Sequence, residues 1–254
     1  MKGASRTREG STPWFRDWFG REYLALYPHR DRAEARQAVA LLHETTGRKP
    51  GARVLDLACG AGRHLVELSR VGYRAVGLDL SMPMLDAARH TADAAVLTRA
   101  DMRHLPFRPG AFDIVTSYFT SFGYFADERD DLRVLREVRR VLDAEGWFLL
   151  DFMNAHHVVA NLRERDCRNV SGLHVVQERR LVERGRIVEK RITIGAADST
   201  PQKEFVERVR LYRPEELVAM LEDTGFVPGP RFGGYDLSGF SPQSPRCIFM
   251  AAAS

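Results

Sequence analysis

The chain has 254 residues, of which 44% are hydrophobic and 28% charged, a composition typical of a globular protein with one full core. No apolar stretch is long enough to cross a bilayer, and the N-terminus lacks the apolar segment of a signal peptide. The three cysteines (Cys59, Cys167 and Cys247) are scattered and lack CxxC spacing, so neither disulfides nor a zinc centre are predicted. We therefore expect a cytoplasmic protein with no membrane association and no metal.

The net charge of +4 is too small for a chain of this size to indicate a nucleic-acid partner by itself. Residues 163–191 contain nine Lys and Arg against five Asp and Glu, an excess equal to that of the whole chain. This segment could present a basic face to RNA or to an acidic substrate. A solvated surface of Arg and Glu on a sheet is the interpretation that the pattern favours.

Residues 1–12 are polar and rich in Gly, Ser and Thr, so a disordered tail is predicted. A dense aromatic stripe at helical spacing follows, and we expect its tryptophans to pack on a sheet. A helix over residues 33–44 and a turn over residues 47–51 precede the first strand. The stripe consists of Trp14, Phe15, Trp18, Phe19, Tyr23, Leu24 and Tyr27.

The segment VLDLACGAGRH, residues 54–64, organises the rest of the chain. Its first four residues form a short apolar run broken only by Asp56, which is typical of a strand buried in a parallel sheet. Gly60 and Gly62 allow a tight turn that approaches a ligand closely, and helical spacing begins at Arg63. A strand, a glycine turn and a helix N-terminus together predict a site for a nucleotide-like ligand.

A second acid strengthens this prediction. Residues 74–80 read as the next strand, and Asp79 lies at its end, 23 residues after Asp56. An acid at that distance is placed to bind the two hydroxyls of a ribose. The third glycine of the dinucleotide motif is replaced by Leu65, so NAD is not the leading ligand.

The following segments alternate between helix and strand. Ser81 is predicted to cap a helix over residues 83–89, and strands are expected over residues 95–99, 114–117 and 147–152. A helix over residues 127–142 separates the last two. The aromatic loop of residues 118–125 follows a strand end, where it could line a substrate pocket or close the top of the core.

The pattern changes after Met153. Residues 170–194 and 204–212 are rich in Val, Ile and Arg with partial alternation, which predicts a three-stranded antiparallel meander. A helix from Arg213 and a hairpin of residues 228–236 and 246–252 complete the chain. We therefore expect a single domain over residues 13–254, with an antiparallel β lobe inserted at about residues 165–212.

At these motifs the chain resembles the class I S-adenosylmethionine (SAM) methyltransferases, and more narrowly their bacterial small-molecule branch. Asp56 stands at the acidic position of the first motif, and Ala58, Gly60 and Gly62 stand at its three small positions. Asp79 stands at the position of the ribose acid. The resemblance implies an α/β Rossmann-like sheet of seven strands with the last antiparallel, helices on both faces, and SAM as the cofactor.

The resemblance also implies contacts for each part of SAM. Tyr23, Tyr27 and Arg30 would reach the methionine half. The adenine half and the neighbouring strand ends would be lined by Leu80, Met84, Asp101, Met102 and Ser117.

Methyl transfer to a small-molecule oxygen or nitrogen is the function that the resemblance implies, with S-adenosylhomocysteine as the other product. Tyr118, past the fourth strand, and His156 and His157, just past the fifth, are the candidate general bases, although a structural role is the favoured interpretation for each of them. His64 is expected to serve packing or SAM contact. Two alternatives remain: an RNA or tRNA methyltransferase, and a SAM-binding sensor that transfers no methyl group. The chain lacks the Asn/Asp-Pro-Pro-Tyr/Phe motif used on exocyclic amines, so nucleic acid is not the favoured acceptor. Both a monomer and a homodimer remain open.

Overall fold

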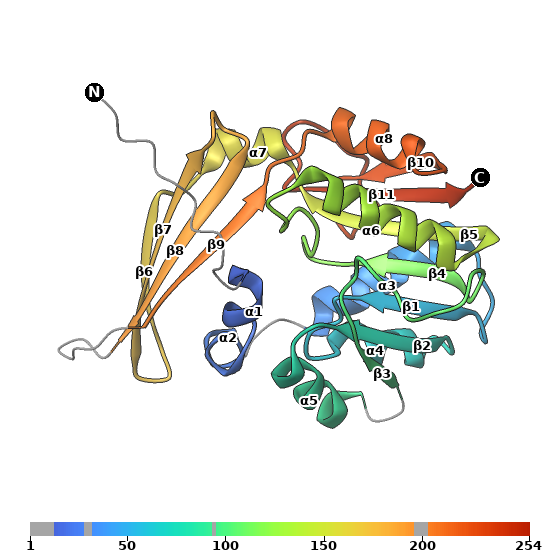
Figure 1. Cartoon of the computed structure of the whole chain (residues 1–254), viewed down its shortest axis with the longest axis horizontal. Helices are drawn as coiled ribbons and strands as arrows, with labels where there is room; N and C mark the ends of the chain where they lie inside the picture. The colour runs from blue at the N-terminus through green and yellow to red at the C-terminus, as the bar shows by residue number, and fades with distance from the viewer. Residues whose placement is uncertain (1–12, 28–31, 93–94, 196–202) are drawn as a thin grey trace.

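The computed structural model describes residues 13–27, 32–92, 95–195 and 203–254. They form two sheets, a large one with helices on both faces and a smaller antiparallel one that stands apart from it (Figure 1). The predicted N-terminal tail lies outside the described residues.

The large sheet has seven strands in the order β10-β11-β5-β4-β1-β2-β3. Strand β11 pairs antiparallel with both β10 and β5, and the remaining pairs are parallel. This arrangement confirms the predicted Rossmann-like sheet. The strands are β1 (Arg53–Leu57), β2 (Arg74–Asp79), β3 (Val96–Arg99), β4 (Phe112–Ser117), β5 (Leu142–Met153), β10 (Phe226–Phe232) and β11 (Arg246–Ala253).

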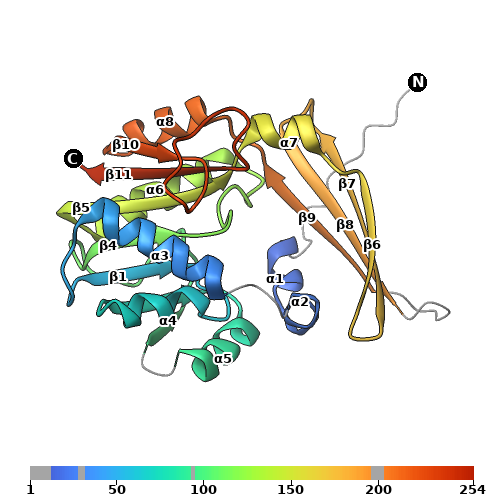
Figure 2. The ribbon, with the colours of Figure 1, turned by 180° about the vertical axis from the view of Figure 1, so that it is seen from behind.

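Helices cover both faces of this sheet (Figures 1 and 2). Neighbouring residues of β1 point to opposite sides, so Val54 packs with one buried cluster and Leu55 with the other. The Val54 cluster includes α3 and α4, whereas the Leu55 cluster includes α6 and α8. Because both faces are buried, the central strands read as apolar runs. The helices are α3 (Arg32–Thr46), α4 (Arg63–Arg70), α5 (Met82–Thr91), α6 (Glu128–Val141) and α8 (Pro214–Asp223).

The smaller sheet is the predicted lobe, but it has four strands and not three. The additional strand is β6, whose sequence RDCRNV carries too few apolar residues to be recognised. A short helix, α7 (Ala155–Asn161), precedes the lobe and was not predicted either. The strands, in antiparallel order, are β6 (Arg165–Val170), β7 (Leu173–Val182), β8 (Ile187–Gly195) and β9 (Lys203–Arg210).

The aromatic stripe forms two short helices, α1 (Trp14–Trp18) and α2 (Arg21–Leu26), which lie between the large sheet and the lobe (Figures 1 and 2). The expected packing of its tryptophans on the large sheet is wrong for Trp18. That ring lies 4.7 Å from Phe205 of β9 and shares a buried cluster with Val175 and Ile192. Longer helices already cover both faces of the large sheet, so the stripe instead buries its rings against the lobe.

Candidate cofactor and acceptor site

A cavity of about 1580 Å³ lies where the carboxyl ends of the parallel strands face the lobe. Its wall combines the glycine turn after β1, the ends of β2, β3 and β4, helices α1 and α2, and one face of the lobe. Ligands of open α/β sheets bind at this edge. The volume exceeds the 300–1,000 Å³ typical of a small-molecule site, so there is room for two ligands side by side.

The two glycines in the turn between β1 and α4 have different structural roles. Gly60 has φ of 55°, and a Cβ built there would meet no atom within 4 Å, because the position opens onto the cavity. Gly62 has φ of 80°, and its Cβ would lie 3.1 Å from the Cβ of Ala88. Gly60 therefore leaves space for a ligand against the backbone, whereas Gly62 permits α4 and α5 to pack closely.

Asp79 forms hydrogen bonds with two turns, the glycine turn after β1 and the turn between β2 and α5. Its carboxylate accepts the backbone N–H of Gly60 at 2.9 Å and that of Ser81 at 2.8 Å. Burial raises the pKa of Asp79, although these N–H donors oppose the shift. Each carboxylate oxygen has a further lone pair that can accept a ligand hydroxyl.

Asp56 lies buried behind the glycine turn and does not line the cavity. Its Oδ1 accepts from Thr116 Oγ1 at 3.1 Å, whereas its Oδ2 has no donor among the residues that the structure describes. Burial raises the pKa of Asp56 to about 7, although Thr116 and the charge of Arg63 oppose the shift.

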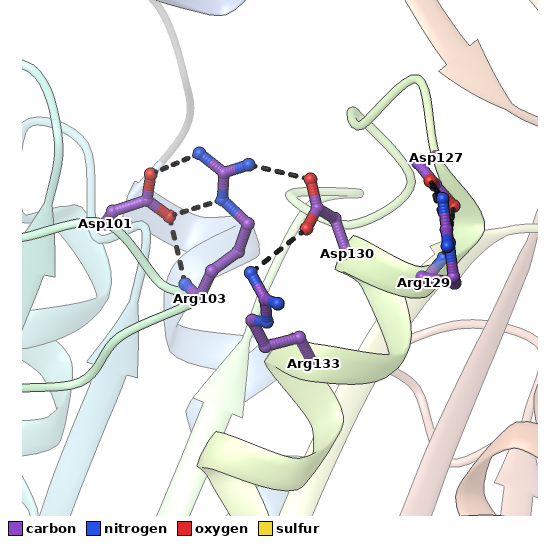
Figure 3. Close-up of polar contacts among 6 residues, drawn as sticks. All are labelled: Asp101, Arg103, Asp127, Arg129, Asp130 and Arg133. Atoms are coloured by element: carbon purple, nitrogen blue, oxygen red, sulfur yellow. Dashed lines mark hydrogen bonds and ion pairs between the residues drawn. The ribbon is translucent and has the colours of Figure 1, made fainter.

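Asp101 lines the cavity and is held by an arginine (Figure 3). Arg103 donates to both oxygens of Asp101 and also bonds Asp130 of α6 at 2.7 Å. Burial raises the pKa of Asp101, but the Arg103 hydrogen bonds outweigh it, so the net shift is downward. The carboxylate therefore stays ionised and fixed in direction. Asp127 and Arg129, also drawn in Figure 3, form a separate pair at the start of α6.

The other predicted cofactor residues divide into two groups. Tyr23, Tyr27, Ala58, Leu80, Met84 and Met102 line the cavity together with Gly60, Asp79 and Asp101. Gly62 and Ser117, like Asp56, support the wall from behind. Arg30 lies outside the described residues.

The candidate bases are placed very differently. Tyr118 lines the cavity, stacks on His64 with ring centroids 4.1 Å apart, and has a buried hydroxyl that no described residue bonds. Burial raises the pKa of Tyr118 well above its ordinary value, so the hydroxyl keeps its proton and can donate a hydrogen bond. His156 is exposed on α7, and neither it nor His157 lines the cavity.

Arg63, which the sequence interpretation did not single out, lines the cavity at the start of α4. Its Nη1 bonds Glu34 at 2.7 Å, and its guanidinium lies 5.0 Å from the centre of the Phe119 ring. The buried Nη2 has no acceptor within the described part of the chain. The signal available in the sequence was a cation immediately after the glycine turn.

A second group that sequence reasoning missed holds the aromatic loop in place. Asp151, at the end of β5, accepts from one edge of the Arg246 guanidinium, its Oδ1 from Nε at 2.6 Å and its Oδ2 from Nη2 at 2.5 Å. Asp151 also accepts the Phe119 N–H at 2.7 Å and the Tyr235 hydroxyl. Across the described ranges, no group of three or more His, Cys, Asp or Glu side chains is arranged to hold a metal ion.

The face of the lobe that borders the cavity is polar at its centre. Gln177 and Lys190 each donate to the hydroxyl of Tyr27 at 3.1 Å. Arg168, Arg179 and Glu207 line the same wall.

These features fit SAM. The Gly60 position is an open cradle for a ligand, and Asp79, which lines the cavity, has acceptor capacity for ribose hydroxyls. None of the described helices is both long and apolar enough to span a membrane.

A family model described as a methyltransferase domain matches residues 54–146. A dTDP-3-amino-3,4,6-trideoxy-alpha-D-glucopyranose N,N-dimethyltransferase of Streptomyces venezuelae is 32% identical over 165 residues, which are 61% of this chain and 69% of that protein. The sugar N-methyltransferase KedS8 from Streptoalloteichus sp ATCC 53650 is 26% identical with a TM-score of 0.71, covering 100% of this chain and 98% of that one.

Other relatives match only in part. The putative methyltransferase YqeM of Bacillus subtilis is 34% identical over 102 residues, which are 39% of this chain and 41% of that protein. The chain therefore spans about two fifths of the length of this relative and of several others.

The sheet order, the glycine turn and the acid at the end of β2 define a Rossmann-like methyltransferase fold. The chain belongs to the class I SAM-dependent methyltransferases.

Proposed function

We propose that the protein transfers the methyl group of SAM to an amine nitrogen of a small-molecule acceptor. The observation that carries this proposal is that one continuous cavity joins the glycine turn to the polar face of the lobe. Relatives whose names specify N-methylation of amino sugars support the choice of nitrogen over oxygen.

In this proposal the cofactor occupies the sheet side of the cavity. Asp79 would hold the ribose, Asp101 and Met102 would contact the adenine, and the Gly60 backbone would lie against the methionine half. Bound SAM supplies an electrophilic methyl group for an in-line displacement. The residues of the chain hold the two reactants in line and exclude water.

The proposed reaction needs little proton transfer from the protein. A neutral amine attacks with its own lone pair, so a strong general base is unnecessary. Tyr118 keeps its proton and would orient the acceptor by donating a hydrogen bond. Trp14 of α1, Phe19 just after it and Tyr124 of the loop after β4 pack together in the cavity wall and would limit access of water.

The direct test supplies purified protein with SAM and matched pairs of sugar nucleotides that carry either an amine or a hydroxyl at the same carbon. We expect S-adenosylhomocysteine release and a mass gain of one methylene with the amine member only. A folded Asp79→Ala variant is the negative control for cofactor binding. Transfer to the hydroxyl member alone would overturn the choice of nitrogen.

The same assay separates the two alternatives. Methylation of total tRNA in preference to sugar nucleotides would favour an RNA methyltransferase. Tight SAM binding without product from any acceptor in the set would favour a sensor.

A further inference from the structure

Arg168 of β6 lines the cavity with hydrogen-bonding capacity that the protein leaves unused. Its Nε and Nη2 atoms are buried and have no acceptor among residues 13–27, 32–92, 95–195 and 203–254. Its guanidinium carbon lies 4.9 Å from the centre of the Tyr27 ring. A ring over the guanidinium face leaves the N–H groups at the edge of the plane available to a ligand.

The neighbouring cations on this wall are already paired with carboxylates. Arg179 bonds Asp166 at 2.6 Å, and Lys190 bonds Glu207 at 3.1 Å. The strand register explains both pairs. Lys190 lies opposite Glu207, and Asp166 lies opposite Gln177, two residues before Arg179 on the same face of β7. Within the described part of this wall, Arg168 is the cation without a carboxylate partner.

The rest of the basic segment favours the solvated interpretation. Five of the eight Arg side chains in residues 163–191 pair with a carboxylate, Arg179 with Asp166 and four others with Glu on neighbouring strands or on α8, which disfavours an open basic face for RNA. The four pairs with Glu are Arg165–Glu178, Arg180–Glu189, Arg186–Glu216 and Arg191–Glu204.

Leaving the buried Nε and Nη2 of Arg168 without acceptors is unfavourable, because these two groups have lost water without gaining a partner. The planar fork of arginine matches the two oxygens of a carboxylate or phosphate. We infer that Arg168 binds an anionic group, phosphate or carboxylate, carried by the methyl acceptor. This inference rests on the proposed function, since it assigns the group to the acceptor of that reaction.

The position of Arg168 sets the orientation of the acceptor in the cavity. Its anionic end lies against β6, and its amine extends toward the glycine turn and Tyr118. The lobe therefore selects the acceptor by charge, and an analogue without the anionic group loses binding to the lobe while SAM binding is unaffected.

The experiment titrates protein saturated with S-adenosylhomocysteine with inorganic pyrophosphate and, separately, with malonate, by calorimetry. The two probes distinguish a phosphate group from a carboxylate group. The variants are Arg168→Gln, which removes the charge, and Arg168→Lys, which keeps the charge but not the fork. Arg165→Gln is the matched control, because Arg165 belongs to the same strand but is exposed and does not line the cavity.

We expect at least one probe to bind the wild type and to bind Arg168→Gln roughly 10- to 100-fold more weakly, as for the loss of charged hydrogen bonds. Arg168→Lys should fall between the two, and Arg165→Gln should match the wild type. SAM affinity and the melting temperature check the fold of each variant, and Arg168→Lys decides the question if Arg168→Gln does not fold.

Equal affinities in the wild type and the Arg168 variants, or no binding of either probe, would overturn the inference. The titration requires no turnover, so it is independent of the choice of acceptor atom. Binding that depends on Arg168, without methylation of any amine, would contradict the proposed function but not the anion site.

Discussion

The hydroxyl of Tyr212 donates a 2.8 Å hydrogen bond to Asp131, and both side chains are completely buried. Tyr212 follows the last strand of the lobe, and Asp131 lies in the first turn of α6. Asp131 also accepts the N–H of Gly123 at 3.2 Å, in the aromatic loop after β4. The carboxyl group of Asp131 thus links α6 to two other segments, the chain that leaves the lobe after β9 and the aromatic loop after β4.

This link predicts a pH dependence of stability. Burial raises the pKa of Asp131 to about 7, whereas an unfolded Asp titrates near 3.9. Between about pH 4 and pH 7 the native state binds more protons than the unfolded state, so the free energy of unfolding falls as the pH rises. Asp131→Asn should remove part of this fall, measured by urea unfolding at pH 4.5, 6 and 7.5.

Tyr212→Phe is the companion variant. It keeps the carboxyl group but removes a donor that lowers its pKa, so the fall in stability should extend to higher pH. Burial also raises the pKa of Asp56 to about 7, so Asp131→Asn should leave a residual slope of the same sign. An Asp131→Asn profile that overlays the wild type would contradict the assigned pKa.

The role of Gly60 in cofactor binding can be tested by comparing it with Gly47, a glycine of similar backbone conformation. Gly60 and Gly47 have φ of 55° and 58°, and a Cβ at either meets no atom within 4 Å. An alanine at either position costs roughly 1–2 kcal/mol of stability, because it is forced into the left-handed region. Only Gly60 lines the cavity, so calorimetry should show weakened SAM binding for Gly60→Ala and unchanged binding for Gly47→Ala. Equal affinities in the two variants would remove Gly60 from the cofactor site.

Asp79→Ala should weaken SAM binding by roughly 1–3 kcal/mol, because ribose hydroxyls would be left without an acceptor in a site shielded from water. Part of the loss of affinity will come from a change in the glycine turn, because Asp79 also accepts the Gly60 N–H. Calorimetry on the folded variant measures the change, with circular dichroism as the fold check. Wild-type affinity would show that Asp79 does not contact the cofactor.

The sequence could predict those elements whose signals are local. The apolar run before Gly60, the acid at the end of β2 and the Ser81 cap of α5 each depend on a few adjacent residues, and the structure has all three. Strand β6 escaped prediction because its inward-facing residues, Asp166 and Arg168, are polar. They face a cavity, and a polar wall gives no hydrophobic alternation to read.

Other features depend on contacts between distant segments. Residues 204–212 were predicted to belong to the lobe, but Tyr212 packs in the main core. Its hydrogen-bond partner there, Asp131, lies 81 residues earlier in the sequence. Trp18 packs on a strand almost 190 residues away, as its bond to Glu207 shows. Neither pairing leaves a periodicity in the chain, so neither could be recognised before the fold was known.

The role of Tyr118 is open to a discriminating test. Its hydroxyl is buried without a partner in the described residues, and burial raises its pKa well above the ordinary value. A hydroxyl that only orients the acceptor should be worth about one hydrogen bond, so Tyr118→Phe should lower kcat roughly 10-fold. SAM affinity should not change, and stability should not fall, because the variant removes an unsatisfied buried group.

A general base would behave differently. Its removal should cost about 10²- to 10⁴-fold in kcat and abolish a limb of the pH–rate profile. The measurement is kcat against pH for Tyr118→Phe and for His156→Ala, using an amine acceptor found in the S-adenosylhomocysteine assay. We expect both variants to keep the shape of the wild-type profile, with His156→Ala also keeping its height, because His156 is exposed and lies outside the cavity wall. Loss of a limb in Tyr118→Phe would make Tyr118 the base, and a large loss in His156→Ala would require α7 to reach the acceptor.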